Sequence, residues 1–142
     1  MELPKAAAPV ANYVPTVIVG NTLYVSGQVT VLNGEFKFVG KLGKQFKVED
    51  GQQAARLCGL NVIAQAKAAL GGDLDRVKRV AKLGVFVNST DDFTDQPKVA
   101  NGVSDLMVEV FGDAGKHARF AVGTNVLPLD LAVEVDAVIE IG

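Results

Sequence analysis

The sequence predicts an α+β domain in which a single sheet carries both of its helices on one face. Three observations predict it: β-type segments at both ends of the chain, two helix-type segments in the middle, and a β-branched segment between those two helices. The 142 residues fit one domain spanning 1–142. A chain of this length can bury roughly 68–70% of its unfolded surface around one core.

The N-terminal third has the alternation and turn residues of strands. Strands are expected at residues 16–19, 22–31 and 36–39. Gly20-Asn21 separates the first two of these segments. Asn33-Gly34, a pair typical of a hairpin turn, separates the second from the third.

Two segments have helical periodicity. The first covers residues 49–70 and ends at Gly71-Gly72. The second begins near Pro97, because proline suits the first turn of a helix, and Gly112 ends it. Residues 77–87 lie between the two helices and are rich in β-branched side chains, which predicts a strand.

Two further strands are expected at residues 118–126 and 131–141. In the second of these, Leu131, Val133, Val135, Ala137, Ile139 and Ile141 alternate toward one face, which we expect under the helices. If the two strands pair as a hairpin, Arg119 and Glu134 lie together on the opposite face. That face is small and mixed in polarity, so a second subunit could cover part of it.

Composition excludes several classes of function. The net charge is −2, which argues against a nucleic-acid partner because such proteins normally carry a basic field. Cys58 and His117 are the single cysteine and histidine, so neither a disulfide nor a multi-histidine metal site is expected. We therefore expect no metal and no cofactor. Mean hydropathy is +0.25, which favours apolar surface buried between subunits.

No membrane partner is expected, because no apolar run approaches the 18 residues of a membrane span. The first five residues, Met1 to Lys5, lack the pattern of a signal peptide. These two observations predict a cytoplasmic protein.

Several motifs, in the right order, carry a resemblance to a known family. They are Gly20 to Gln28, Val85-Phe86-Val87 followed by Asp92-Phe93, His117 to Gly123, and Leu127-Pro128 followed by Val133-Glu134-Val135. Through them nearly the whole chain resembles the RidA/YjgF family of small enamine/imine deaminases. The resemblance implies a chorismate-mutase-like fold and a homotrimer that forms through the sheet face opposite the helices, with clefts between subunits. It also implies a reaction in which water attacks the imine carbon of a 2-imino acid and releases a 2-keto acid and ammonia.

The resemblance also implies two catalytic residues. Arg119 matches the arginine that binds the substrate carboxylate, and Glu134 matches the carboxylate that orients the attacking water. A guanidinium can hold a carboxylate through two charge-assisted hydrogen bonds, and a half-covered carboxylate can act as a general base. From the residues alone, the alternative is a salt bridge between the two.

The remaining site residues are substrate-binding positions. Ser26 and Gly27 match the segment that lines the cleft, and Tyr13 matches a site tyrosine upstream of the first strand. Asn101 matches an asparagine supplied by the neighbouring subunit. Ala121 stands where many family members have a cysteine, so its backbone carbonyl remains but a thiol does not. For Ser26 and Gly27, a β-bulge or simple close packing is the structural alternative.

Three other functions stay open at this point. They are a specialised catabolic deaminase for aminomuconate-like acids, a non-enzymatic trimer that binds keto acids, and an endoribonuclease. The preferred side chain of the substrate is left open as well. His117 lies two residues before Arg119 and is therefore expected on the same face of the strand. The simpler interpretation is that it is a residue at the start of the strand or at a subunit interface, rather than one that tunes the site.

Overall fold

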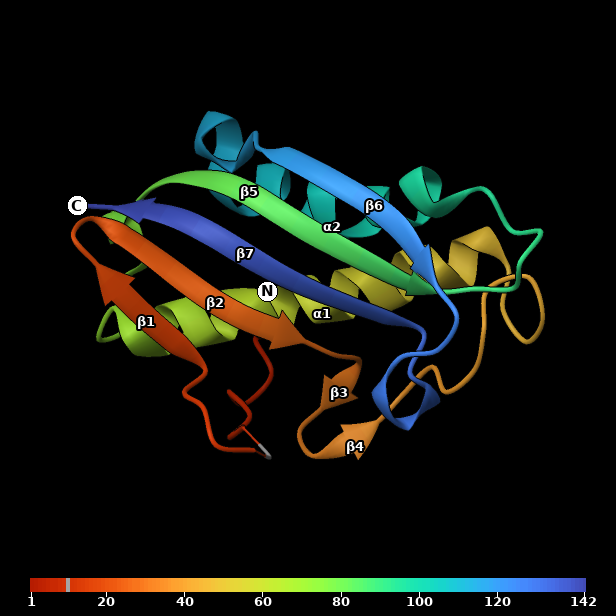
Figure 1. The fold of residues 1–142 in the computed structure, drawn as a ribbon. Helices are drawn as coiled ribbons and strands as arrows, with labels where there is room; N and C mark the ends of the chain where they lie inside the picture. Colours follow the sequence, from red (N-terminus) through yellow and green to blue (C-terminus); the bar gives the residue numbers. More distant parts are fainter. Residues whose placement is uncertain (10) are drawn as a thin grey trace.

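A five-stranded sheet backed by two helices forms the body of the protein (Figure 1). The computed structural model describes residues 1–9 and 11–142. In chain order the sheet strands are β1 (Thr16–Val19), β2 (Thr22–Gln28), β5 (Val77–Asn88), β6 (Ala118–Thr124) and β7 (Val133–Ile141). Their spatial order is β1-β2-β7-β5-β6, with β5 and β6 parallel and the other neighbours antiparallel. The α+β prediction is confirmed.

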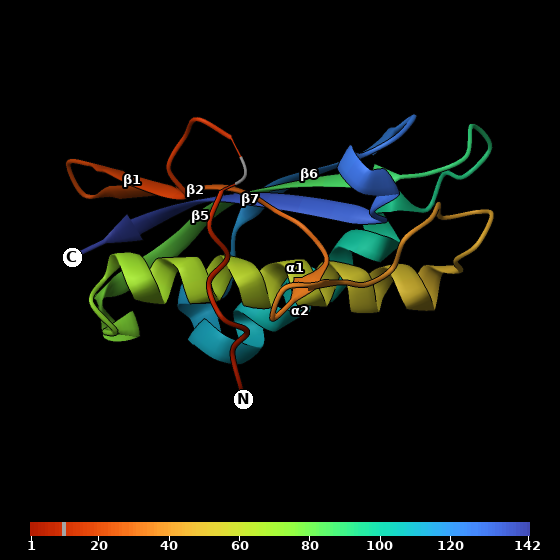
Figure 2. The same cartoon turned by 90° about the horizontal axis from the view of Figure 1, so that it is seen from below.

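The helices α1 (Val48–Ala69) and α2 (Gln96–Phe111) both lie on the same face of this sheet, and the opposite face is open (Figure 2). The side chain of Asp50 accepts the backbone N–H of Lys47 at 2.9 Å at the start of α1. Pro97 lies in the first turn of α2, and Gly112 ends the helix with φ +62°. Both helices therefore begin and end within a residue or two of the positions that the sequence predicts.

Short elements connect the larger ones. They are the hairpin strands β3 (Val31–Leu32) and β4 (Glu35–Phe36), and the 3-10 turns η1 (Leu74–Arg76), η2 (Gly112–Gly115) and η3 (Pro128–Asp130). The strands expected at 22–31 and 36–39 are both shorter than predicted. The register of β2 against β7 shifts between Val25 and Gln28, which ends regular pairing at Gln28.

The core lies between the sheet and the two helices. The alternating residues of β7, Val133 to Ile141, are buried in this core, as the sequence predicts. Leu131 is buried as well, but it precedes β7 and lies outside this core, so the expectation of a place under the helices is wrong for it. Gly59 of α1 faces α2, where a Cβ would stand 2.7 Å from a methyl group of Val103. A glycine at this position lets the two helices pack closely.

The predicted hairpin of the last two strands is wrong. β5 lies between them, and its Phe86 is the register partner of both Val122 on β6 and Glu134 on β7. Residues that share a register position point to the same face, so Val122 and Glu134 lie on the open face. Arg119 shares its position with Leu83 and therefore points to the helix face.

The length of the connection between these strands explains the difference. Eight residues, 125–132, separate β6 from β7, whereas a tight hairpin uses two to five. This segment is long enough to pass the end of β5, so β7, which buries every second residue, takes the central position in the sheet.

A buried amide joins the loops at one end of the sheet. Asn88, at the end of β5, is fully buried, and its Nδ2 donates to Gly40 O at 3.2 Å, Asp130 Oδ1 at 2.8 Å and Leu131 O at 3.1 Å. Its Oδ1 accepts from Lys41 Nζ at 2.7 Å. The loop before α1 and the loop before β7 are therefore fixed to the same side chain.

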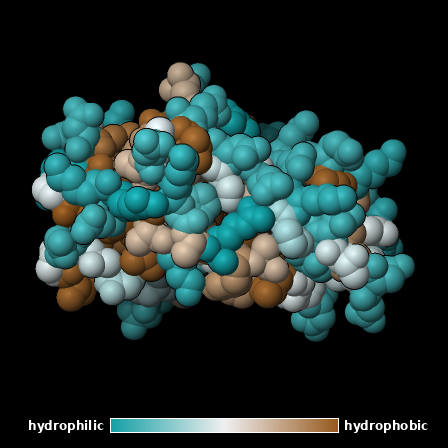
Figure 3. All heavy atoms as spheres, turned by 90° about the horizontal axis from the view of Figure 1, so that it is seen from above, coloured by the Kyte–Doolittle hydropathy of each residue, from teal (hydrophilic) through white to brown (hydrophobic). Residues whose placement is uncertain are grey.

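The open face of the sheet is mixed in polarity. Its exposed apolar side chains include Val17, Tyr24 and Val122, and the charged Lys82 and Asp136 lie among them. The side of the molecule that carries α2 and β6 is mostly hydrophilic, with hydrophobic residues in small separate patches (Figure 3). No helix in the described ranges is both long and apolar enough to cross a membrane.

Candidate active site

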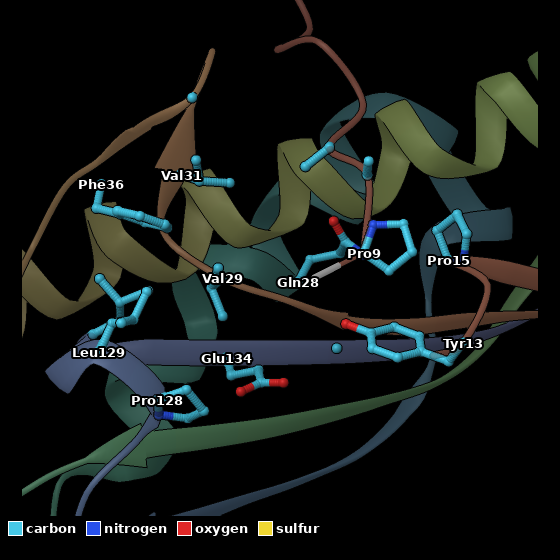
Figure 4. A pocket seen from close by; sticks show the side chains of 15 residues that line it. Pro9, Tyr13, Pro15, Gln28, Val29, Val31, Phe36, Pro128, Leu129 and Glu134 are labelled. Atoms are coloured by element: carbon cyan, nitrogen blue, oxygen red, sulfur yellow. The ribbon is translucent and has the colours of Figure 1, made fainter. Parts of the chain in front are cut away.

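A cavity of about 350 Å³ lies on the open face of the sheet, and the carboxylate of Glu134 points into it (Figure 4). Its walls come from the N-terminal segment, β2, the β3–β4 hairpin and η3. A concave and largely apolar space with a carboxylate in it is the usual form of a small-molecule site.

Two effects raise the pKa of the Glu134 carboxyl above its usual value. The larger is burial, which disfavours the ionised form, and the smaller is the nearby negative charge of Asp136. A glutamate with a raised pKa is better matched to accepting a proton near neutral pH.

Gly27 lies directly against this carboxylate. A Cβ placed on Gly27 would overlap Glu134 Oε2 and stand 2.9 Å from its Cδ. The register shift of β2 includes Ser26 and Gly27, so the β-bulge considered for this segment is present. The bulge brings the main chain of β2 against the Glu134 carboxylate, so the bulge itself forms part of the cavity wall.

Ser26 and Tyr13 contribute in different ways. The Ser26 N–H donates to Pro15 O at 2.9 Å and its hydroxyl donates to Val14 O at 3.0 Å. These two bonds attach the segment before β1 to β2. That segment carries Tyr13, which lines the cavity with its hydroxyl end toward the middle (Figure 4). Ser26 therefore holds Tyr13 in place and does not line the cavity itself.

Arg119 belongs to a second group of residues, on the helix face of β6. Its Nη1 donates to Asn101 Oδ1 at 3.0 Å and to Ser104 Oγ at 2.9 Å, and its Nη2 donates to Pro97 O at 3.0 Å. All three partners are neutral and belong to α2. A guanidinium has five N–H donors, so two remain for a carboxylate from outside the described residues. An Arg119–Glu134 salt bridge does not form within the described parts of one chain.

Ser104 and His117 extend the support of this arginine. His117 Nδ1 lies 2.6 Å from Gly115 O, which can only accept, so Nδ1 carries the proton. In the neutral ring Nε2 then accepts from the Ser104 hydroxyl, which is 2.8 Å away. The Ser104 oxygen in turn accepts from Arg119. The chain of bonds from Gly115 to Arg119 fixes the guanidinium against α2.

The structure thus gathers the expected residues into two groups rather than one. Gly27, Tyr13 and Glu134 surround the cavity on the open face, and Arg119 and Asn101 are hydrogen-bonded on the helix face. The expectation that Arg119 and Glu134 share a face was wrong, because it assumed the hairpin. Ala121 lies on the sheet-edge strand β6 with its methyl group against the core.

Metal-binding potential is low in the region described. Residues 1–9 and 11–142 contain no group of three or more His, Cys, Asp or Glu side chains placed to hold a metal ion. The buried Cys58 donates its thiol to Val133 O at 3.3 Å, and burial raises the pKa of this thiol well above its usual value. Cys58 is therefore an unreactive core residue.

Comparison with known proteins assigns the chain to a protein family. Residues 1–141 match the family model described as "YjgF/chorismate mutase-like, putative endoribonuclease". The chain belongs to the YjgF/chorismate mutase-like family. It is 54% identical over 142 residues to Protein TCP17 of Trypanosoma cruzi, covering 99% of this chain and 88% of that protein.

Two other similarities extend this finding. The crystal structure of the protein Atu1372 of Agrobacterium tumefaciens, titled as having unknown function, superposes with a TM-score of 0.91 at 48% identity, covering 95% of this chain and 86% of that one. The 2-iminobutanoate/2-iminopropanoate deaminase of Dermatophagoides farinae is 29% identical over 140 residues, covering 97% of this chain and 92% of that protein. The YjgF membership and the chorismate-mutase-like fold are both confirmed.

Proposed function

We propose that this YjgF-family protein hydrolyses 2-imino acids, the tautomers of reactive 2-enamino acids, to 2-keto acids and ammonia. The observation that carries the proposal is the division of the site into two complementary halves. One half offers a carboxylate in a cavity, and the other offers a fixed guanidinium with two donors left. The name of the Dermatophagoides farinae relative supports the same substrate class.

The two halves face opposite sides of one sheet, so a complete site needs a second copy of the chain. We propose a homotrimer in which the Glu134 half of one subunit meets the Arg119 half of its neighbour. The mixed polarity of the open face supports an interface there, because exposed Tyr24 and Val122 would be covered. Asn101 would then reach the cleft together with the arginine that it contacts.

The residues have distinct roles in the reaction. Arg119 holds the substrate carboxylate through a two-point contact, which places the imine carbon over Glu134. As the water oxygen bonds to this carbon, Glu134 takes a proton from the water and the C=N electron pair moves to nitrogen. Glu134 passes this proton to the nitrogen, which gives the neutral carbinolamine and leaves Glu134 ionised again. Glu134 then takes the hydroxyl proton as the C=O bond forms and the C–N bond breaks, and it hands this proton to the departing nitrogen, which leaves as ammonia. The products are the 2-keto acid and ammonia, and the base is regenerated.

A coupled assay tests this function. An amino-acid oxidase with catalase would generate 2-imino acids in the presence of the purified protein, and the release of keto acid and ammonia would be followed. We expect faster release than the spontaneous rate. Keto-acid binding without acceleration would indicate a binding protein instead, and cleavage of RNA without deamination would indicate a ribonuclease.

The raised pKa of Glu134 predicts the pH dependence of turnover. The base must be ionised, so activity falls as pH drops through its pKa, and this acidic limb should lie above the usual value for glutamate, about 4.5. Asp136→Asn removes a negative charge that disfavours ionisation, so the limb should move to lower pH. Burial remains, so the limb should not return fully to the usual value. A pH profile of kcat/KM measures both.

Glu140→Gln is the matched control for this prediction. Glu140 is the third carboxylate on this face of β7, after Glu134 and Asp136, but it lies opposite Thr22 and Arg79 at the other end of the strand. The limb should stay in place in this variant. Equal shifts in the two variants would show that general surface charge, rather than Asp136, controls the limb.

Gly27→Val should reduce turnover much more than stability. The new side chain would occupy the position of the Glu134 carboxylate and displace it from the cavity. We expect kcat to fall at least about tenfold, as when a general base is misplaced, with a small change in Tm. Binding of the product keto acid, measured by calorimetry, should change less because Arg119 is untouched. Full turnover in the variant would place the reaction elsewhere.

A further inference from the structure

The cavity around Glu134 has two unlike ends. Toward one end lie the Tyr13 hydroxyl, Pro9 and Pro15 (Figure 4), and Gly27 lies against the Glu134 carboxylate itself. The other end is walled by carbon, from Val29, Val31, Phe36, Pro128, Leu129 and Leu131. In Figure 4, Val31, Phe36, Leu129 and Pro128 lie together on the side of Glu134 that is away from Tyr13. A ligand held over Glu134 therefore meets the Tyr13 hydroxyl on one side and a wall made only of carbon on the other.

The apolar end is deep and open. Leu131 is 1% exposed and Val31 9%, whereas Phe36 is 48% exposed and Leu129 66%. The first two therefore form the base of the apolar end, and the last two form its mouth. Exposed apolar side chains that surround a cavity with a carboxylate in it indicate a place for an apolar part of a ligand.

Turns with positive φ angles lie at or next to both residues of the cavity mouth, Phe36 and Leu129. Phe36 follows the β3–β4 turn, in which Asn33 and Gly34 both have positive φ, +51° and +87°. Leu129 has φ +60° and Asp130 has φ +57°, a left-handed conformation that leucine rarely adopts. Asp130 is fixed by Asn88 Nδ2 at 2.8 Å and by the N–H of Gly40 on its carbonyl at 2.7 Å. Such strain persists where surrounding bonds impose it, and it is common at ligand sites.

We propose that the preferred substrates are 2-imino acids with a large apolar side chain, as derived from leucine, methionine or phenylalanine. This inference rests on the proposed deaminase function. Arg119 of the neighbouring subunit takes the carboxylate and Glu134 faces the imine carbon, which leaves the carbon-walled end for the side chain. The whole cavity has a volume of about 350 Å³, and an alanine-derived imino acid has only a methyl group to place in the carbon-walled end of it, so that end stays largely unfilled.

The size of the preference follows from the apolar surface that is removed from water. Each buried methylene favours binding by about fourfold. A leucine-derived imino acid has three more carbons than an alanine-derived one, so kcat/KM should be higher by at least about tenfold and up to about fiftyfold.

The test compares imino acids generated in place from alanine, leucine and phenylalanine by a broad-specificity amino-acid oxidase. Each rate is measured with wild-type protein, Phe36→Ala and Leu32→Ala. Leu32 is the matched control, because it belongs to the same hairpin and is similarly exposed at 39%, but it does not line the cavity. We expect Phe36→Ala to lower kcat/KM for the leucine and phenylalanine imino acids by about tenfold and to spare the alanine one. Leu32→Ala should preserve the wild-type ratio.

The other possible results contradict either the side-chain preference or the deaminase function itself. If the wild-type protein accelerates the alanine imino acid as well as the leucine one, the side-chain inference fails and the deaminase function stands. If it accelerates none, the deaminase function itself fails. If Phe36→Ala changes the mass of the assembly in solution, the same ratio is measured with Leu129→Ala. An unchanged ratio in a variant that retains the wild-type assembly shows that the apolar end does not hold the substrate side chain.

Discussion

Arg119→Ala is expected to lower kcat/KM for a 2-imino acid by at least about a hundredfold while the protein stays folded and assembled. Two charge-assisted bonds to a carboxylate contribute about 1.5–3 kcal/mol each, or roughly 3–6 kcal/mol together. A factor of ten corresponds to about 1.4 kcal/mol, so this loss is a hundredfold or more. Arg119→Lys should recover little, because an ammonium lacks the planar two-point geometry.

The structure explains why the fold should tolerate this change. The partners of Arg119 are the neutral Asn101, Ser104 and the carbonyl of Pro97, so its removal leaves no buried charge unpaired. The measurement is a melting curve and a solution mass beside the deaminase assay. Lys98→Ala is the control, because it removes a positive charge from an exposed side chain on the same helix.

Two results would contradict the assignment of Arg119. Normal turnover in a folded Arg119→Ala assembly would end the deaminase proposal in its present form. A loss of stability that Glu134→Gln restores would indicate an ion pair between the two residues. Such a pair could form only between subunits, because within one chain the two side chains lie on opposite faces of the sheet.

Mixing two inactive variants should restore activity, which is the second large effect expected. Arg119→Ala retains the Glu134 half-site, and Glu134→Gln retains the Arg119 half-site. When equal amounts are refolded together, a site is intact wherever a Glu134 half from the first variant meets an Arg119 half from the second. Random assembly into a closed ring gives about a quarter of the sites this composition.

The mixed sample should therefore reach about a quarter of wild-type turnover, whereas each variant refolded alone stays inactive. The controls are mixtures of Arg119→Ala with Arg119→Lys, which cannot form an intact site. No recovery in a sample that contains mixed assemblies would show that both halves of a site come from one chain. That result would need a rearrangement of β6 relative to β7.

Much of the fold could be predicted because its signals are local. Helix ends at Gly71-Gly72 and Gly112 and the Asn33-Gly34 turn depend on residues close in sequence. The alternation of β7 predicted which of its sides is buried. The pairing of β6 with β5 could not be predicted in this way, because strand order depends on how the connection at 125–132 passes the end of β5.

The site shows the same division between local and distant information. Arg119, Glu134 and Gly27 stand in motifs, so they could be named as candidates from the sequence. Ser104 was missed, because a serine within a helix carries no signal until the fold places Arg119 and His117 beside it. Leu129 was missed as well, since its left-handed backbone depends on hydrogen bonds made by residues far away in the sequence.

The side-chain amide of Asn88 couples the stability of the cavity wall to that of the loop before α1. Asn88 is bonded to Gly40 and Lys41 on one side and to Asp130 and Leu131 on the other. Local opening of one loop exposes polar groups of the other, so the two should unfold together as one cooperative unit. The contour of the cavity at Leu131 thus depends on a loop some ninety residues earlier in the chain, and sequence changes in either loop should be constrained by the other.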